Sequence, residues 1–159
     1  MNIRYERARL SYTRDIHRLI CAAADAGQML PRALSDLYEC VRDFVVAIDA
    51  DTGRIIGCCG LHVIWEDLAE VRSLAVDEAW RGHGIGRNLV EMCMADAAEL
   101  AIPRVFALTY VPGFFKKLGF YDISKDQLPH KVWSDCIKCH KFPDCDEHAV
   151  ARAIAVPVR

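Results

Sequence analysis

The segment AWRGHGIGRNLVEM, residues 79–92, has three glycines within five positions (Gly82, Gly84 and Gly86) and then continues in a helical pattern. Glycine lowers helix stability more than any residue except proline, so three glycines at the start of a helix require a reason. An ordinary tight turn between a strand and a helix is one reason. The alternative is a backbone that has to approach a ligand closely, where side chains would obstruct contact.

The neighbouring sequence favours a site for phosphate groups. A strand is predicted over residues 69–76, just before the glycines, and Arg81 and Arg87 flank them. Free N–H groups at a helix start carry about half a positive charge, which suits a pyrophosphate. The spacing does not match the dinucleotide-binding fingerprint, whose third glycine would fall at Arg87. No lysine-serine pair follows the glycines, as it does in nucleoside triphosphatases.

Apolar periodicity and turn residues predict a mixed α/β sheet flanked by helices. Strands are expected over residues 3–10, 44–49, 54–65, 69–76 and 104–110, with a last strand in the tail. Helices are expected over 13–27 (N-cap Thr13, stop at Gly27), 35–43 (cap Ser35), 85–100, 113–120 and 146–155. No internal repeat or linker divides the chain, which predicts a single domain over residues 1–159 with a C-terminal tail over 128–159.

Composition excludes several classes of protein. The 159 residues are 53% apolar and 26% charged, which is typical of a globular domain. A net charge of −2 gives no general attraction to nucleic acid or to an anionic membrane, so neither is expected as a partner. No stretch reaches the ~18 apolar residues that span a bilayer, and residues 1–15 lack the apolar core of a secretory signal. A cytoplasmic location is therefore expected.

Two motifs resemble the landmarks of the GNAT N-acetyltransferase superfamily. RGHGIG, residues 81–86, resembles its R/Q-x-x-G-x-G/A signature, and FFKKLGF, residues 114–120, resembles its F-Y-x-x-x-G-F landmark. They follow in the usual order, one strand apart, and the resemblance covers roughly residues 1–125. It implies a mixed sheet whose fourth and fifth strands splay apart, with acetyl-coenzyme A as cosubstrate in the opening.

The resemblance also implies which residues bind the coenzyme. The pantetheine arm would pair with the backbone of the SLAV strand, residues 73–76, and the pyrophosphate would lie on the N–H groups of residues 83–87. The expected cofactor-binding residues are Leu74, Ala75, Val76, Arg81, Gly82, His83, Gly84, Ile85, Gly86 and Arg87. Most of these contacts use the backbone, so small residues matter more here than charged ones.

Glu70 lies where GNAT enzymes often carry a general base, and the backbone N–H of Leu74 is the expected oxyanion donor by analogy. A plain ion pair between Glu70 and Arg72 is the alternative, because the two share a strand face. The sequence departs from the family at Phe115, where many members have a tyrosine acid. Tyr110 or Tyr121 takes that role instead, or the thiolate leaves unassisted.

The tail LPHKVWSDCIKCHKFPDCDE, residues 128–147, resembles the short stand-alone bacterial N-acetylglutamate synthases, which begin arginine biosynthesis. Glutamate has two carboxylates, so its pocket needs cations, and Arg72 and Lys131 are the expected substrate ligands. Lys116 and Lys117 are further candidates. Glutamine, another amino acid, a protein amine and a non-catalytic acetyl-coenzyme A sensor stay open as alternatives. Homodimers are common in the superfamily, which leaves a dimer open.

Eight cysteines do not predict a disulfide scaffold in a long chain without an export signal. Five of them are expected to be small buried hydrophobes, namely Cys21, Cys40, Cys58, Cys59 and Cys93. The other three, with one histidine, offer three or four zinc ligands, Cys136, Cys139, Cys145 and His148. Reduced thiols or a redox pair are the alternative. Because the spacing is short for a zinc knuckle and GNAT chemistry needs no metal, no metal site is predicted.

Overall fold

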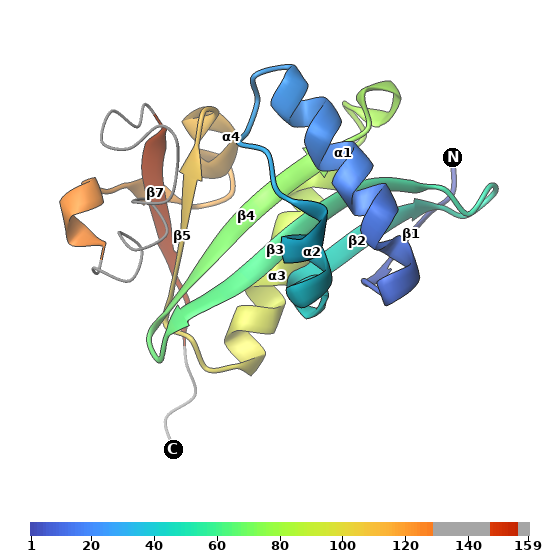
Figure 1. The fold of residues 1–159 in the computed structure, drawn as a ribbon. Coiled ribbons are helices and arrows are strands. Elements are labelled where there is room, and N and C mark those ends of the chain that lie inside the picture. The colour runs from blue at the N-terminus through green and yellow to red at the C-terminus, as the bar shows by residue number, and fades with distance from the viewer. Residues whose placement is uncertain (129–146, 156–159) are drawn as a thin grey trace.

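A computed structural model describes residues 1–128 and 147–155 and shows one seven-stranded sheet with the strand order β1-β2-β3-β4-β5-β7-β6 (Figure 1). The strands are β1 Ile3–Arg7, β2 Phe44–Asp49, β3 Ile55–Trp65, β4 Leu68–Val76, β5 Arg104–Thr109, β6 Tyr121–Asp122 and β7 His148–Ala153. The α-helices are α1 Thr13–Asp25, α2 Leu34–Glu39, α3 Ile85–Glu99 and α4 Pro112–Lys116. Short 3-10 helices are η1 Leu10–Tyr12, η2 Val41–Asp43, η3 Glu78–Trp80 and η4 Lys125–Gln127.

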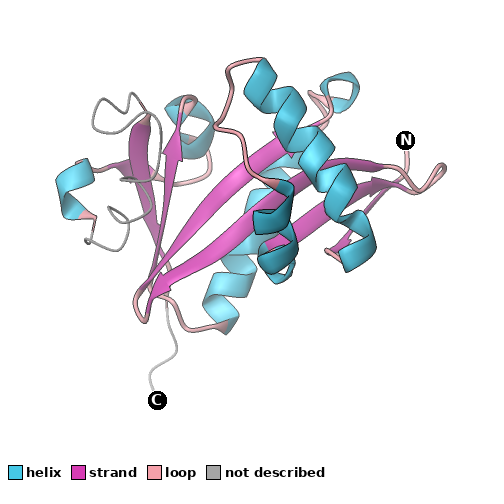
Figure 2. Ribbon diagram, in the orientation of Figure 1, coloured by secondary structure: helices cyan, strands magenta, loops and turns pink. Residues whose placement is uncertain are grey.

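Helices cover both faces of this sheet, which confirms the predicted fold class (Figure 2). Helix α1 packs over β2 and β3 through an apolar cluster that includes Ile16, Ile20 and Phe44. Helix α3 covers the opposite face through a larger cluster that includes Leu89 and Phe115. The sheet is therefore buried on both sides at its centre, and the two clusters hold it as the middle of three layers.

Strands β4 and β5 are parallel and pair only at their beginnings. Their ladder consists of Ala69 opposite Val105 and Glu70 opposite Phe106. Beyond these pairs the two strands diverge toward their carboxyl ends (Figure 1). The splayed pair of central strands is therefore confirmed, and it opens the sheet directly after Glu70.

A β-bulge interrupts β4 at the same place. Cys58 of β3 pairs with Ala75, and Gly60 pairs with Arg72, so Ser73 and Leu74 together face the single residue Cys59. Ser73 has a φ of 56°, which is rare for a residue other than glycine. A bulge of this kind leaves one residue out of the ladder and bends the strand.

The helix predicted over 146–155 is wrong, because the described part of this segment forms β7, antiparallel to both β5 and β6. Alanines give the segment helix propensity, but pairing with the two strands buries Ala149, Val150 and Ala151 and overrides it. The predicted caps are also wrong. Thr13 is the first residue of α1 and its hydroxyl donates to the Leu10 carbonyl at 2.8 Å, while α2 begins before Ser35.

Three of the five cysteines expected in the core are fully buried, namely Cys58, Cys59 and Cys93. Burial raises the pKa of Cys58 to about 12, so its thiol stays protonated near neutral pH. Cys21 and Cys40 are only half-buried. No helix within residues 1–128 and 147–155 has the length and apolar character that a membrane crossing requires.

Candidate active site

The glycine-rich loop enters α3 through two residues with positive φ. Gly82 has a φ of 83° and Gly84, the N-cap of α3, has a φ of 76°. A Cβ atom at either position would contact nothing within 4 Å, so the backbone conformation, rather than crowding within the protein, requires glycine there. The same empty space leaves the backbone open to a ligand.

Gly86 has a different role, in the first turn of α3. A Cβ atom there would lie 3.4 Å from the ring of Phe114 and 3.9 Å from Val76. Phe114 belongs to the FFKKLGF motif, so the two sequence landmarks pack against each other. This contact fixes α4 beside the start of α3.

The start of α3 has the properties of an anion site. The first N–H groups of any helix have no acceptor inside the helix, and they form its positive end. In the part of the chain that the structure describes, no side chain caps this start. The exposed residues His83 and Arg87 lie in this region, and Arg81 donates to the Gln28 side chain at 2.7 Å. The loop thus has the features of a site for an anion that is bound mainly by backbone N–H groups.

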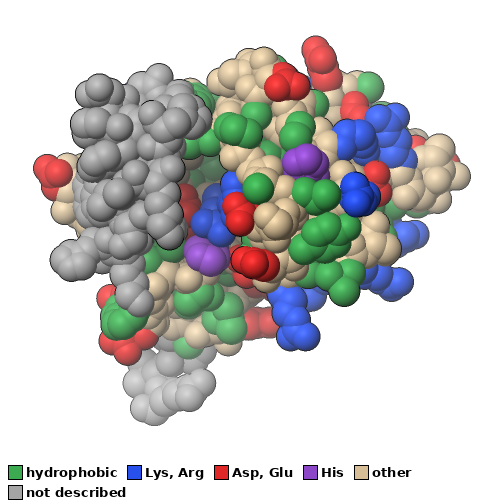
Figure 3. Space-filling view, in the orientation of Figure 1, with side chains coloured by type: hydrophobic (Ala, Val, Ile, Leu, Met, Phe, Trp, Pro, Cys, Tyr) green, Lys and Arg blue, Asp and Glu red, His purple; other side chains and the backbone are tan. Residues whose placement is uncertain are grey.

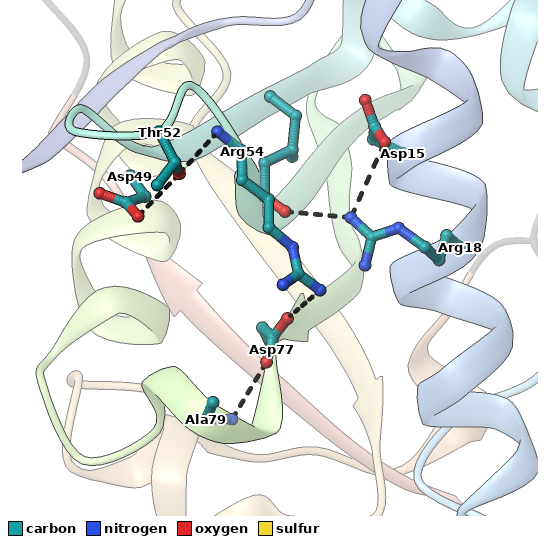
Figure 4. Close-up of polar contacts among 8 residues, drawn as sticks. Asp15, Arg18, Asp49, Thr52, Arg54, Asp77 and Ala79 are labelled. Carbon is teal, nitrogen blue, oxygen red and sulfur yellow. Dashed lines mark hydrogen bonds and ion pairs between the residues drawn. The ribbon is translucent and has the colours of Figure 1, made fainter.

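Asp77 ties the loop to the rest of the sheet (Figure 4). Its carboxylate accepts from the backbone N–H of Ala79 at 3.0 Å and from Nη2 of Arg54 at 3.1 Å. Arg18 of α1 donates to the carbonyl of Ile55, the neighbour of Arg54, at 3.3 Å. These bonds connect the segment leading into the glycine loop with the β2–β3 turn and with α1.

Glu70 and Arg72 lie on the face of β4 that points toward α1 and α2, since Ala69 and Val71 alternate with them and pack into the core beside α3. Their side chains are 14% and 18% exposed. Arg72 Nη1 lies 3.8 Å from Glu70 Oε1, so the predicted ion pair is present. Both side chains sit at the point where β4 and β5 separate.

The structure adds two residues that the sequence did not identify, His62 and Asp43. His62 of β3 is the direct cross-strand partner of Glu70, and its Nδ1 lies 2.8 Å from Oδ2 of Asp43. Figure 3 shows a histidine together with acidic and cationic side chains over β3 and β4 on this face. Counting outward from the turn pair of Trp65 and Leu68 would have placed residue 63, not residue 62, opposite residue 70, because a register shift between Val63 and Trp65 moves the pairing by one residue. Nothing in the sequence indicated Asp43.

Phe115, which replaces the usual tyrosine, belongs to the core. It is 4% exposed and makes edge-to-face contacts with Phe114 and Phe120, with ring centroids 5.2 Å apart in each case. Of the two alternative tyrosines, Tyr110 directly follows β5, at the end where the strands splay. Tyr121 lies on β6, the far edge of the sheet, and is 47% exposed. Position therefore favours Tyr110.

Four predicted residues, Lys131, Cys136, Cys139 and Cys145, lie outside the described residues. His148, the fourth candidate zinc ligand, is the exposed first residue of β7 and pairs with Thr109. Within residues 1–128 and 147–155, no three His, Cys, Asp or Glu side chains are grouped so that they could hold a metal ion.

The two sequence landmarks predicted the arrangement of an acetyltransferase, in which a glycine-rich helix start lies beside an opened sheet. The described residues have this arrangement. Residues 13–120 match the Acetyltransferase (GNAT) family, and the chain belongs to that family. It is therefore an N-acetyltransferase with acetyl-coenzyme A as cosubstrate.

Relatives support this assignment over different lengths. A protein from Chlorobaculum tepidum named as an uncharacterized N-acetyltransferase is 42% identical over 147 residues, which cover 92% of this chain and 94% of that protein. An amino-acid acetyltransferase from Mycobacterium tuberculosis is 39% identical over 113 residues, 70% of this chain and 65% of that protein. One from Vibrio atlanticus is 31% identical over 72% of this chain, which matches only 26% of that protein.

Solved structures show the same fold. A Mycobacterium tuberculosis protein in complex with CoA and NLQ superimposes with a TM-score of 0.82 at 32% identity, over 96% of this chain and 99% of that one. The N-acetylglutamate synthase of Neisseria gonorrhoeae, complexed with coenzyme A and N-acetyl-glutamate, gives a TM-score of 0.87 at 24% identity. That match covers 98% of this chain and 36% of the synthase.

Proposed function

We propose that this chain transfers the acetyl group of acetyl-coenzyme A to the α-amino group of L-glutamate, the first step of arginine biosynthesis. The observation that carries the proposal is the mostly buried pair of Glu70 and Arg72, a carboxylate and a cation that lie together where the sheet opens. Two kinds of relative support it. They are the amino-acid acetyltransferase of Mycobacterium tuberculosis and the Neisseria synthase with N-acetyl-glutamate.

The coenzyme would be held by the backbone of residues 74–76 and by the loop over residues 81–87. Bound there, it supplies an acetyl group activated as a thioester. The positive φ of Gly82 and Gly84 and the open space around them suit a pyrophosphate on the N–H groups of α3. Splaying of β4 and β5 gives the pantetheine arm a strand edge to pair with, since β4 has no partner on that side beyond Glu70 within the described residues.

Glu70 would act as the general base. An amino acid carries its amine as an ammonium group, which cannot attack a thioester until it loses a proton. A carboxylate at the opening takes that proton directly or through one water. Because Glu70 and Arg72 share a face, the base and the substrate ligand would act on the same bound molecule.

The bulge in β4 supports an oxyanion role for the N–H of Leu74. A bulge leaves one residue out of the strand ladder, and in the proposed role the N–H of Leu74 donates to the acetyl oxygen. Negative charge develops on the acetyl oxygen during transfer. One donor of this kind is worth about 3–4 kcal/mol of transition-state stabilisation.

Arg72 would bind a carboxylate of glutamate, and Lys131 would be a second cationic ligand, as the resemblance to N-acetylglutamate synthases implies. The guanidinium binds a carboxylate through two parallel hydrogen bonds, which an amide group cannot match. Arg72 is proposed to bind the side-chain carboxylate, and this contact would favour glutamate over glutamine, whose side chain ends in an amide. Tyr110, next to the opening, is the proposed proton donor to the leaving thiolate.

A thiol-release assay with acetyl-coenzyme A and a panel of acceptors tests the proposal. The panel contains L-glutamate, L-glutamine, L-aspartate, a polyamine and a peptide with a free N-terminus. We expect thiol release to require an amino acid and to be fastest with glutamate. Release with the peptide alone would assign a protein amine as acceptor. Coenzyme binding without release on any amine would assign a sensor, and either result would overturn the proposal.

A further inference from the structure

We propose that His62 relays the proton from Glu70 to solvent and that Asp43 holds the imidazole in place for this transfer. The inference rests on the proposed base role of Glu70 and assigns two residues to the reaction that neither the sequence motifs nor the comparisons indicate. A general base that has taken a proton from each incoming ammonium group has to lose it before the next turnover. At 14% exposure, the Glu70 side chain has little direct contact with water, so a neighbouring proton carrier would speed this step.

The strand register places the two side chains together. His62 of β3 is paired directly with Glu70 of β4 in an antiparallel ladder. Directly opposed residues on antiparallel strands point to the same face, with Cβ atoms about 5 Å apart. At this spacing one bridging water can carry a proton from the carboxylate to the imidazole. The His62 side chain is 34% exposed, against 14% for Glu70, so the pair leads from the opening toward solvent.

Asp43 determines which nitrogen of His62 can accept the proton. Its Oδ2 lies 2.8 Å from Nδ1 of His62. A neutral imidazole has one N–H, and a carboxylate accepts it, so the proton stays on Nδ1 and the lone pair stays on Nε2. Among the described residues, the charged groups that face His62 are Asp43 from η2 and Glu70 and Arg72 from β4.

The proton balance closes in three steps. An N–H bond of the ammonium group breaks as an O–H bond forms on Glu70, which frees the amine for attack. The O–H bond then breaks as an N–H bond forms on Nε2 of His62, and the Asp43 carboxylate stabilises the resulting imidazolium. The imidazolium releases the proton to water, which restores neutral His62 and ionised Glu70.

The test compares His62→Gln, His62→Ala and Asp43→Asn with the wild-type chain in the thiol-release assay. Glutamine can still donate to Asp43 but carries no exchangeable ring proton. We expect kcat with the amino-acid acceptor to fall about tenfold or more for each variant, while the KM for acetyl-coenzyme A stays constant. Added imidazole should restore turnover of His62→Ala in proportion to its concentration. The pH dependence of kcat in these variants should differ from that of the wild type, because the imidazole no longer takes part in proton transfer. His17→Gln, at another half-buried histidine, is the matched control and should behave as wild type.

The outcomes separate this inference from the proposed function. If Glu70→Gln is as active as wild type, Glu70 is not the base and the proposed function loses its mechanism. If Glu70→Gln is inactive while His62→Gln keeps the wild-type kcat and pH profile, the base role stands and the relay is wrong. Loss of activity in His62→Ala that imidazole does not restore would also overturn the relay. If a thermal melting experiment shows that the His62 variants do not fold, Asp43→Asn carries the test. An unchanged kcat and an unchanged pH dependence of kcat in Asp43→Asn would then contradict the relay.

Discussion

Arg72 and Glu70 form an ion pair across one face of β4, with Nη1 and Oε1 3.8 Å apart and both side chains more than four-fifths buried. Exposed ion pairs contribute little to stability, and the desolvation cost of burying two charges can exceed their mutual attraction, so stability alone does not explain this pair. The position of the pair is consistent with a role in the site, because β4 separates from β5 directly after Glu70. In the proposed function, a substrate that enters there would meet a carboxylate and a guanidinium together.

Substitution of Arg72 should impair acceptor binding. We expect Arg72→Gln to raise the KM for glutamate about 10- to 100-fold, because it removes a charge-assisted hydrogen bond worth about 1.5–3 kcal/mol. Arg72→Lys should recover only part of the loss, since lysine keeps the charge but not the two parallel bonds. The KM for acetyl-coenzyme A should stay constant. Arg14→Gln, at an exposed position on α1, is the control. An unchanged KM for glutamate in Arg72→Gln would exclude Arg72 as a substrate ligand.

Substitution of Glu70 should impair the chemical step. Glu70→Gln keeps the shape of the side chain and removes its ability to take a proton, so kcat should fall about 10²- to 10⁴-fold. Calorimetric titration should give the same affinity for acetyl-coenzyme A as the wild type. Glu66→Gln, an exposed glutamate in the β3–β4 turn, provides the comparison and should keep full activity. A fall in kcat of less than threefold would contradict the base role.

Gly84 allows a matched test of the coenzyme loop. Gly84 and Gly53 both have a φ of 76°, and a Cβ atom at either position meets nothing within 4 Å. Gly84→Ala and Gly53→Ala should therefore lower the free energy of unfolding by a similar amount, about 1–2 kcal/mol. Only Gly84→Ala should weaken acetyl-coenzyme A binding, because only that methyl group lies where the pyrophosphate is proposed to bind. Equal coenzyme affinities in the two variants would contradict this location.

Asp77 should contribute to coenzyme affinity through the shape of the loop. Asp77→Ala removes both the bond to the N–H of Ala79 and the ion pair with Arg54, and should lower the free energy of unfolding by about 1 kcal/mol. Arg54→Gln removes the exposed ion pair alone and should cost less than that. We expect coenzyme affinity to fall in Asp77→Ala and to stay near the wild-type value in Arg54→Gln. If titration with acetyl-coenzyme A shows the larger loss of affinity in Arg54→Gln, the ion pair, and not the turn, shapes the loop.

The bond between Tyr12 and Glu6 predicts a pH-dependent term in stability. The Tyr12 hydroxyl donates to the Glu6 carboxylate, which lowers the pKa of Glu6 and raises the pKa of Tyr12. Because the pKa of Glu6 is lower in the folded state, the bond stabilises the fold at pH values above the pKa of Glu6 in the unfolded chain. This stabilisation is lost as the pH falls through the pKa of Glu6 in the folded state. Because the pKa of Tyr12 is higher in the folded state, the bond also stabilises the fold at pH values below the pKa of Tyr12 in the unfolded chain. This stabilisation is lost as the pH rises through the pKa of Tyr12 in the folded state.

Tyr12→Phe should therefore be destabilised most at neutral pH. The difference from wild type should shrink below about pH 4 and above about pH 10. Denaturant titrations at a series of pH values measure it, and Tyr38→Phe, an exposed tyrosine, serves as the control. A difference that stays constant down to acid pH would show that the bond contributes nothing specific to the ionised carboxylate.

Local signals in the sequence were sufficient to predict the conformation of the glycine-rich loop, the helix that follows it and the face of β4 that carries Glu70 and Arg72. Glycines at positions 82 and 84 correspond to positive φ values, and the apolar pattern after them corresponds to α3. The alternation along residues 69–76 correctly placed Glu70 and Arg72 on one face. These features depend on residues close together in the chain, so short-range rules describe them well.

Features that depend on distant residues were not predictable in the same way. The segment of β7 has helix propensity, and it is a strand only because β5 and β6 pair with it. The bulge at Ser73 has no sequence signal, because serine does not favour positive φ. Asp43 reaches His62 across 19 positions of sequence, and only the folded position of η2 beside β3 creates that contact.

The measurement that tests the central claim most directly is a competition between two acceptors in one reaction. Equal concentrations of L-glutamate and L-glutamine are incubated with acetyl-coenzyme A, and mass spectrometry quantifies both products at low conversion. Because the product ratio equals the ratio of the two kcat/KM values, it reports specificity without separate kinetics. The proposed site predicts N-acetylglutamate in clear excess. An excess of N-acetylglutamine, or no acetylation of either amino acid, would contradict it.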